Sequence, residues 1–481
     1  MSENLPVSDR TNQNVSGLRA ECLSFPEIIS QSFANVAPTA APTVSVGLVF
    51  ANAGNGTWLT FAIAMIGVVF VGLNISQFAR RSASPGSLYA YISMGLGSTM
   101  GVISGWSLLL AYLFAGMAVV AAFSNFANVL LSLIGLELSP IFLFAICTGV
   151  GWYLAYKDIQ LSTKLMLGLE AFSVSLLLLI ALIVLFKHGF AIDMSQLSLK
   201  DTKPDGLILG LILAIFSYTG FESATALGDE AKNPLKFIPA AVVLTPILCG
   251  LFFTLLAYTE VLAFSGYSTP LDKSDSPIND VANIAGVGFL GLLITIGALV
   301  TFFSCVIACI NAGSRILFTM ARHGIFHNAM GLAHRSNRTP HIAITMLSII
   351  LFIVPASMSL FSLQILDIIT YMGTLATYGF LTAYISIAIA APVYLYRQRI
   401  LNILDIAIAV LAVLFMLIPV VGSVYPAPPF PFNVFPYLFL MYLCVGGAWF
   451  LMLRLHSPEV IENIEDELEK IHAKFSEMKK I

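Results

Sequence analysis

Two long apolar runs of this 481-residue chain are interrupted by residues that break helices. In the first run, Pro38 and Pro42 stand four residues apart, and each proline removes a backbone donor and clashes with the preceding turn. In the second run, Gly220 lies among polar and aromatic residues, just before Glu222. Amides and carbonyls freed by such breaks bind anions and cations without any charged side chain. The two breaks are therefore the first candidates for a ligand site.

Hydroxyl and aromatic side chains surround both breaks. Thr39, Ser217 and Tyr218 can hydrogen-bond a charged ligand, although Thr and Ser at such positions also cap broken helix ends. Phe216, Tyr218 and Phe221 can form an apolar lid over a ligand, and the alternative for each ring is packing without ligand contact. We expect the two breaks to face one central cavity.

Two carboxylates, Glu170 and Glu222, stand inside apolar runs. Removal from water disfavours the charged form of a carboxylate, which makes each residue a candidate proton carrier. Glu222 is the stronger candidate because it adjoins a break; the alternative for both is a structural acid bonded to the backbone. Glu260 stands near the outer end of a run, where we expect it to be solvated.

The composition defines the class of protein that carries these breaks. Apolar residues make up 58% of the chain and charged residues 10%, against roughly 25% charged residues in soluble domains. So few charges cannot cover a soluble surface of this size, which argues against an ordinary cytosolic enzyme. The net charge of −3 indicates no polyanionic partner such as nucleic acid. A polytopic membrane protein remains.

Apolar runs bounded by Gly, Pro and charge predict twelve membrane spans. The expected spans are residues 26–50, 58–78, 100–133, 140–156, 162–186, 207–227, 237–264, 289–321, 342–360, 365–395, 400–424 and 435–455. If the amino terminus is inside, the inner loops carry twelve basic residues and the outer loops four. This bias places both termini in the cytoplasm of a multi-pass protein of the inner or plasma membrane.

The breaks fall in spans one and six, as a repeat of five helices plus five requires. We therefore divide the chain into a cytosolic segment (1–25), a first repeat (26–200), a second repeat (201–395), two added helices (396–456) and a tail (457–481). Apolar residues recur at three- and four-residue steps in the tail, which predicts an amphipathic cytosolic helix. A solvated, frayed tail is the alternative.

Four stretches of the chain resemble the amino acid–polyamine–organocation (APC) superfamily of permeases. Residues 80–91 contain Pro85-Gly86 before Tyr89-Ala-Tyr91. Residues 220–239 contain Gly220-Phe-Glu222, Glu-Ala-Lys-Asn-Pro and Ile-Pro, the most specific of the four similarities. Residues 311–324 and 338–343 are similar to the end of the eighth helix and the start of the ninth.

The resemblance implies an all-α fold of twelve helices, with an inverted five-plus-five repeat and two added helices. It also implies secondary transport of an amino acid or related amine by alternating access, with the substrate between helices one and six. Carried over by position, the substrate-binding candidates are Asn35, Ala37, Pro38, Thr39, Ala40, Phe216, Ser217, Tyr218 and Gly220. The coupling candidates are Glu222, Glu170, Ser304 and Cys305, with H+ or Na+ as the coupling ion.

Some features depart from the family pattern. Many relatives carry Gly-Ser-Gly or Gly-Thr-Gly at the first break, where this chain has residues 37–40 of sequence Ala-Pro-Thr-Ala. Some proton-coupled relatives use a lysine in helix five, where this chain has about Ser173. Cys305 weakens a sodium site because Na+ prefers oxygen ligands, and helix packing is the alternative for Ser304 and Cys305.

No cofactor, metal site or catalytic residue is expected. Cys305 and Cys309 lack further thiol partners, and His323 and His327 lack the glutamate of a zinc helix. The expected partners are a small-molecule substrate, the coupling ion and the lipid bilayer. The alternatives are a sodium-coupled or facilitative carrier of another small organic solute, a channel, and a polytopic membrane enzyme.

Overall fold

The computed structural model describes residues 16–274, 276–457 and 459–466. Within this part of the chain the regular structure is helical, and the one β-bridge joins Leu23 to Ala231. Ten helical stretches among the described residues are long and apolar enough to cross a membrane. The predicted all-α membrane class is therefore confirmed.

The first half of the chain contains both expected breaks. Its helices are α1 (Phe25–Val36), the π-helix η2 (Ala41–Ser45), α2 (Val46–Ala53), η3 (Gly54–Gly56), α3 (Thr57–Ala79), α4 (Ser87–Leu96), α5 (Ser98–Ser132), α6 (Pro140–Lys157), α7 (Ile159–Lys187), α8 (Met194–Leu197), α9 (Pro204–Phe216) and η4 (Ser223–Leu227). The helix α4 lies in the stretch that resembles a family loop, and the sequence patterns did not predict it.

The second half consists mainly of long helices. They are α10 (Pro234–Phe264), η5 (Leu271–Lys273), α11 (Pro277–Ile284), η6 (Gly288–Leu290), α12 (Gly291–Arg322), η7 (Asn328–Gly331), α13 (His341–Leu360), α14 (Ile365–Arg397), α15 (Ile403–Gly422), η8 (Phe432–Val434) and α16 (Phe435–His456). Prolines remain inside α10, α13, α14 and α15, so a proline in an apolar run did not by itself mark a break.

The ten stretches and the twelve expected spans differ at two places. Phe25–Ala79 is one stretch of 55 residues that contains the first two expected spans. The sixth expected span corresponds to α9, an apolar helix of 13 residues, and the irregular segment after it. Twelve crossings and the inverted repeat therefore stay predictions.

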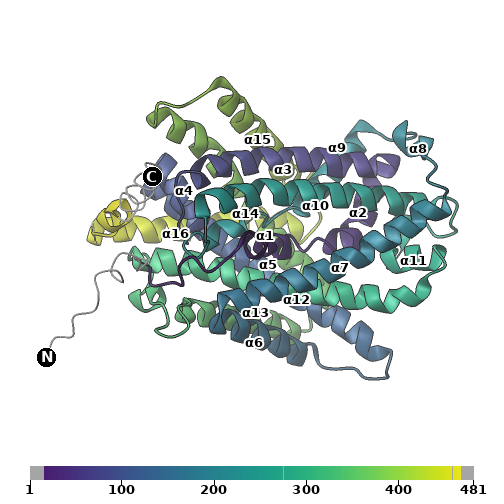
Figure 1. The fold of residues 1–481 in the computed structure, drawn as a ribbon, viewed down its shortest axis with the longest axis horizontal. Coiled ribbons are helices and arrows are strands. Elements are labelled where there is room, and N and C mark those ends of the chain that lie inside the picture. The colour runs from purple at the N-terminus through teal and green to yellow at the C-terminus, as the bar shows by residue number, and fades with distance from the viewer. Residues whose placement is uncertain (1–15, 275, 458, 467–481) are drawn as a thin grey trace.

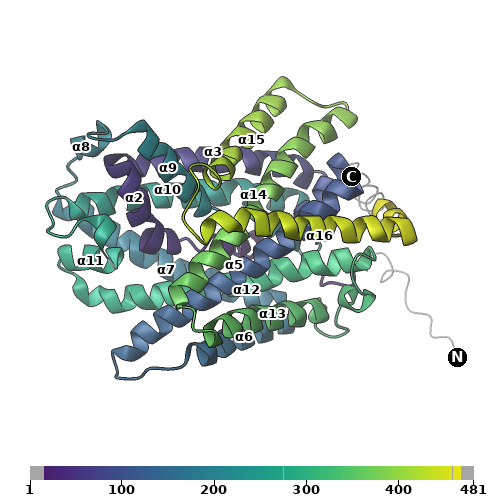
Figure 2. The ribbon, with the colours of Figure 1, turned by 180° about the vertical axis from the view of Figure 1, so that it is seen from behind.

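The long helices lie side by side and glycines allow their closest approaches. In Figures 1 and 2, α8 and α11 lie at one end of the molecule and the last turns of α16 at the other. The helix α5 packs against α14 and α12, and α3 packs against α10. A Cβ atom on Gly72 would lie 2.6 Å from the Val242 carbonyl oxygen, and one on Gly379 would lie 2.6 Å from that of Ser107.

The described part of the tail is helical and packs on the protein. Residues 459–466 are helical, and within them Val460 and Ile464 are buried. Val460 would lie 3.3 Å from a Cβ atom on Gly324, just after α12. Residues 459–466 are therefore helical as predicted. The amphipathic cytosolic helix as a whole stays a prediction, since its continuation from residue 467 lies outside the described part of the chain.

Candidate functional site

The first break follows α1. Ala37 has a left-handed backbone (φ 50°, ψ 66°), and its amide bonds the carbonyls of Phe33 and Ala34 at 3.1 and 3.2 Å. The chain then turns through Pro38 and Thr39 into the π-helix η2. Because a proline nitrogen carries no hydrogen, Pro38 cannot continue the ladder of α1. The interruption predicted at residues 35–41 is present.

The second break follows α9. The backbone turns through residues 217–222, with Gly220 at φ +90°, and continues as the short 3-10 helix η4. A Cβ atom on Gly220 would overlap the Asn35 side chain. Glycine is needed here both for the positive φ and for the space taken by the opposite break.

The two breaks are in direct contact. The Asn35 side-chain amide donates to the Gly220 carbonyl oxygen at 3.2 Å. One turn earlier in α1, the Ser32 hydroxyl accepts from the Ala224 amide at 3.0 Å, and Ser223 donates to the Gln31 carbonyl at 3.1 Å. Residues about 190 positions apart therefore bond each other, so the two breaks are adjacent as expected. A central cavity between them stays a prediction.

Two tyrosines hold Glu222 beside the second break. Tyr112 of α5 donates its hydroxyl to one carboxylate oxygen at 2.7 Å, and Tyr384 of α14 donates to the other. The Tyr384 hydroxyl also accepts the Gly220 amide hydrogen at 2.9 Å. Glu222 therefore fixes Tyr384, and Tyr384 fixes the backbone of the break.

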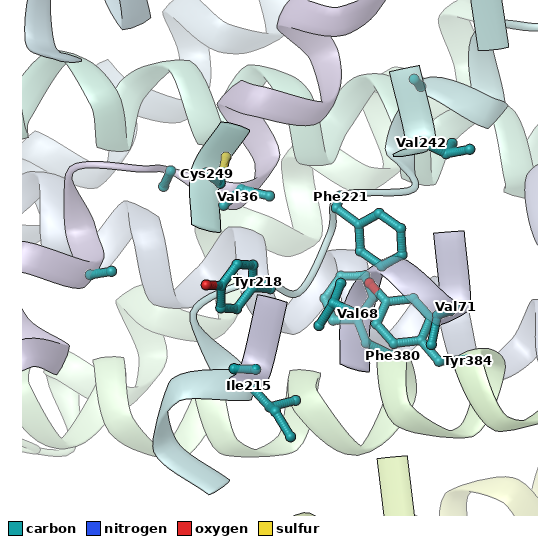
Figure 3. Packing of buried hydrophobic residues seen from close by; sticks show 14 of the residues in the cluster. Val36, Val68, Val71, Ile215, Tyr218, Phe221, Val242, Cys249, Phe380 and Tyr384 are labelled. Atoms are coloured by element: carbon teal, nitrogen blue, oxygen red, sulfur yellow. The ribbon is translucent and has the colours of Figure 1, made fainter. Parts of the chain in front are cut away.

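The rings around this carboxylate form a continuous aromatic cluster. Figure 3 shows Phe221, Phe380 and Tyr384 next to one another, beside Val68 and Val71 of α3. The ring centroids of Phe221 and Tyr384 are 5.2 Å apart, and those of Phe380 and Tyr384 are 6.0 Å apart. The Glu222 carboxylate is buried among these rings. Within the described chain, the hydroxyls of Tyr112 and Tyr384 are the side-chain groups that donate hydrogen bonds to it.

The aromatic residues predicted as a lid are divided between two environments. Tyr218 is fully buried, donates its hydroxyl to the Phe61 carbonyl at 2.8 Å and packs edge-on against Phe253. Phe221 is also fully buried, within the cluster around Glu222. Phe216, at the end of α9, is partly exposed. In this conformation the Tyr218 hydroxyl already donates its hydrogen bond to the protein backbone. Of the three predicted lid residues, Phe216 is the one whose ring is partly exposed.

Two hydroxyls at the breaks are buried without a partner among the described residues. They belong to Thr39 and Ser217. Thr39 lines a gap between the first break, α7 and α12 that has no room for a water molecule. Unpaired buried hydroxyls are rare and costly in proteins, so these two groups are available to a ligand that enters the site.

The helix α12 lies against the first break. Cys305 donates to the Asn35 backbone carbonyl at 3.5 Å, and Cys309 donates to the Asn35 side-chain oxygen at 3.2 Å. Further along α1, Gln31 donates to the Ala308 carbonyl at 2.8 Å. The structure therefore brings Cys305, a predicted coupling candidate, to a carbonyl of the break.

A second buried carboxylate, Glu170 of α7, faces α12. Thr301 donates to one of its oxygens at 3.4 Å, while the other oxygen and the Ser304 hydroxyl have no partner among the described residues. Both Glu170 and Ser304 are buried. Glu170 of α7 thus forms a polar group with Thr301 and Ser304 of α12 near the first break. The hydrogen-bonding capacity of its carboxylate is only partly used.

Glu260 contradicts its predicted environment. It was expected to be solvated, but its relative exposure is 1% and neither oxygen has a partner within the described chain. The helix α10 packs against α7, α11 and η5. The two short elements α11 and η5 were not predicted.

A buried ion pair joins two of the stretches that carry the family resemblance. Arg315 donates to both oxygens of Glu230 at 2.6 and 2.7 Å, and both side chains are fully buried. The Glu230 backbone carbonyl accepts the amides of Cys22 and Leu23, each at 2.9 Å. The pair therefore ties α12 and the segment after η4 to the residues that precede α1.

The sequence patterns missed Tyr112, Tyr384 and this ion pair. The tyrosines lie in uninterrupted apolar helices, 110 and 162 residues from Glu222. A buried carboxylate requires donors, but the sequence does not say which helices supply them. No group of three or more metal-ligating side chains occurs among the residues that the structure describes.

Comparisons with known proteins give one family and several similar transporters. The sequence model of the family described as "Amino acid permease" matches residues 27–453. The branched-chain amino acid permease BcaP of Bacillus subtilis is 24% identical over 368 residues, which cover 72% of this chain and 75% of BcaP. The low-affinity putrescine importer PlaP of Escherichia coli is 28% identical, covering 60% of this chain and 65% of PlaP. The methylthioribose transporter of Bacillus subtilis is 23% identical over a region that covers 70% of this chain and 74% of that transporter.

Proposed function

Because the chain belongs to the amino acid permease family, we propose that it carries an amino acid or related amine across the membrane by alternating access. The observation that carries this proposal is the contact between the two helix breaks, where Asn35 bonds Gly220. The relatives' names include transporters of branched-chain amino acids and of putrescine, and both substrate types carry an ammonium group.

The neutral side chains at the breaks suit a zwitterion or an amine. Amides freed at a helix amino end favour a carboxylate, and freed carbonyls with the hydroxyls of Thr39 and Ser217 favour an ammonium group. In the described conformation the Asn35 side-chain amide donates a hydrogen bond to the Gly220 carbonyl oxygen. A substrate that enters would take over this contact, which separates the two breaks.

We infer that Glu222 links the protonation state to the position of the second break. Protonation changes a carboxylate from an acceptor into a donor on one oxygen. That change would disturb its bonds from Tyr112 and Tyr384 and, through Tyr384, the bond to Gly220. Exchange of H+ at Glu222 would therefore bias the conformation of the site, and the proton is our preferred coupling ion.

Glu170, with Ser304 and Cys305 of α12, is the alternative coupling group. The Glu170 carboxylate can receive a proton, and its oxygens together with the neighbouring Ser304 hydroxyl can bind a small cation. Sodium coupling would require oxygen ligands, and Cys305 places a thiol at the first-break carbonyl instead. The sulfur therefore supports a proton over sodium. The positive-inside rule supports cytoplasmic termini.

Transport measurements in proteoliposomes test the proposal. We expect uptake of at least one radiolabelled amino acid or amine, trans-stimulated exchange, and a response to an imposed pH or sodium gradient. Gly220→Leu should abolish uptake because its side chain would overlap Asn35. Gly447→Leu is the matched control, since a Cβ atom on Gly447 meets open space. Equal uptake by both variants, or flux without counterflow, would contradict a carrier with this site.

A further inference from the structure

Two cavities lie along the same pair of helices, α6 and α13. The first, of about 310 Å³, lies where α6 ends and α13 begins, and its lining residues are Arg19, Lys157, Asp158, Ser336, Asn337 and Arg338. The second, of about 230 Å³, lies between the two helices nearer the middle of the membrane. We call the first the basic pocket and the second the interhelix groove.

The basic pocket has an excess of positive charge. Its one carboxylate, Asp158, pairs with Arg19 at 2.7 Å and also accepts the Gln160 amide at the start of α7. Lys157 and Arg338 are exposed and form no ion pair with any residue that the structure describes. Two cations therefore remain available to an anion.

The wall of the basic pocket is held in place by hydrogen bonds. Asn337 and Thr339 both donate to the Tyr156 carbonyl, at 3.1 and 2.8 Å. Arg338 stands between them with a left-handed backbone (φ 53°) and its amide bonds the His334 carbonyl at 2.9 Å. The loop before α13 is thereby fixed to the end of α6, with the Arg338 side chain at the pocket.

A layer of aromatic rings separates the pocket from the groove. The centroids of Trp152 and Tyr156 are 5.3 Å apart, and those of Tyr156 and His334 are 5.4 Å apart. The Trp152 indole donates to the Thr345 hydroxyl at 3.0 Å across the two helices. Amphipathic rings of this kind concentrate at the level of the lipid headgroups, which places the basic pocket at the membrane surface.

The interhelix groove runs about 10 Å along α6, from Trp152 to Ala145, and its far end lies about one lipid leaflet from the basic pocket. It is lined by Trp152 near the pocket and by Ala145, Gly149, Ile349 and Phe352 further in. At 1.5 Å per residue, Ala145 lies about 18 Å along α6 from Lys157, while half of a bilayer core is about 15 Å. A Cβ atom on Gly149 would meet nothing within 4 Å, so the groove has free space at that point.

We propose that α6 and α13 form a binding site for one anionic phospholipid, with its phosphate in the basic pocket and an acyl chain in the interhelix groove. The excess of two cations, the aromatic layer and a groove whose far end lies about one leaflet from the pocket occur in this order along one helix pair. A larger groove of about 640 Å³ between α9 and α15 has Asp205 in its lining and no basic residue, so it lacks the headgroup site.

Lipid-dependent thermal stability of the purified full-length protein in detergent tests this site. Phosphatidylglycerol should raise the melting temperature in a saturable manner, because a ligand that binds the folded state stabilises it. Phosphatidylcholine with the same acyl chains should give a much smaller shift. Glycerol 3-phosphate, which supplies the phosphate without the chain, should give no shift at the same concentration.

Two variants test the two halves of the site separately. Lys157→Gln with Arg338→Gln removes the excess charge and should weaken phosphatidylglycerol binding roughly twenty-five-fold, since each cation near an anionic lipid contributes a factor of about five. Arg397→Gln with Arg399→Gln removes two exposed cations at the end of α14 and should leave binding unchanged.

Gly149→Leu fills the interhelix groove without altering any charge and should also weaken phosphatidylglycerol binding. Gly447→Leu, on the lipid side of α16, is its control. The proposal is overturned if phosphatidylcholine shifts the melting temperature equally, if the Arg397 and Arg399 variant loses as much binding as the pocket variant, or if glycerol 3-phosphate alone reproduces the full shift. Unchanged binding in Gly149→Leu likewise refutes a bound acyl chain.

Discussion

The hydroxyl of Tyr384 makes two bonds at the second break, and its removal should cost more than removal of either neighbouring tyrosine hydroxyl. It donates to Glu222 and accepts from the Gly220 amide. Tyr384→Phe therefore leaves a buried carboxylate oxygen and a buried amide without these partners. The Tyr112→Phe variant leaves the carboxylate short of one donor, and Tyr218→Phe leaves the Phe61 carbonyl short of one donor.

The expected order of destabilisation follows from these bonds. Loss of one donor to a buried carboxylate costs about 1.5–3 kcal/mol, and an unsatisfied buried amide adds about 1–3 kcal/mol. Tyr384→Phe should therefore cost about 3–6 kcal/mol and Tyr112→Phe about 1.5–3 kcal/mol. Tyr218→Phe removes a neutral bond and should cost about 1–3 kcal/mol. All three changes keep the aromatic ring, so they create no large cavity.

Thermal unfolding and substrate uptake of the three purified variants measure this order. Tyr384→Phe should show the largest fall in both the melting temperature and the uptake rate, because it is the one variant of the three that releases the Gly220 amide. In a Glu222→Gln background, the additional effect of Tyr384→Phe should shrink, since residues that share a hydrogen bond are not additive. If Tyr384→Phe resembles Tyr218→Phe, or if its effect adds fully to that of Glu222→Gln, then the bonded chain from Glu222 to Gly220 has no role in holding the break.

Three further predictions concern charged and titratable groups. Glu222→Gln should still bind substrate but lose the pH dependence of uptake, whereas a pH profile that overlays the parent's would make Glu222 a structural acid and direct attention to Glu170. Glu230→Gln leaves the buried Arg315 unpaired and should cost about 3–5 kcal/mol, and adding Arg315→Met should restore most of the thermal stability. Burial, with a contribution from the nearby Glu230 carboxylate, raises the pKa of Cys22 to about 12, so its thiol is protonated at pH 8. In a Cys444→Ser variant, which removes the exposed cysteine, maleimide should therefore label Cys22 slowly until the protein is denatured. Rapid labelling of Cys22 in the folded variant would contradict its burial.

Sequence patterns were sufficient where a single residue determines the local backbone. Pro38 has no amide hydrogen to continue α1, and Gly220 adopts a φ of +90° that other residues rarely adopt. Both breaks were therefore predicted, and so was their adjacency, because spans one and six correspond in a repeat of five helices plus five. By contrast, the prolines inside α10 did not interrupt that helix, since neighbouring groups in a bundle can satisfy the freed carbonyl.

Contacts between distant helices were beyond the sequence patterns. Tyr112 and Tyr384 are ordinary members of apolar helices until α5 and α14 pack on either side of Glu222. Glu260 was placed in water because it stands near the end of an apolar run, whereas the structure buries it, and α10 packs against α7, α11 and η5. In both cases the environment of a carboxylate depends on which other segments of the chain pack against it. A local sequence pattern does not contain this information.

The contacts at the breaks also suggest how a small ligand could move them. Each hydrogen bond contributes about 0.5–1.5 kcal/mol net. The three bonds that join Asn35 to Gly220, Ser32 to Ala224 and Ser223 to Gln31 therefore hold the breaks together by only about 1.5–4.5 kcal/mol. A shift of a two-state equilibrium from 1:99 to 99:1 requires about 5.5 kcal/mol of differential binding. A substrate whose charged groups engage the freed backbone and the unpaired hydroxyls of Thr39 and Ser217 gains several charge-assisted bonds, each of about 1.5–3 kcal/mol. Two or three such bonds, formed in one conformation and absent in the other, are sufficient to drive the rearrangement, and no charged side chain at the breaks is required.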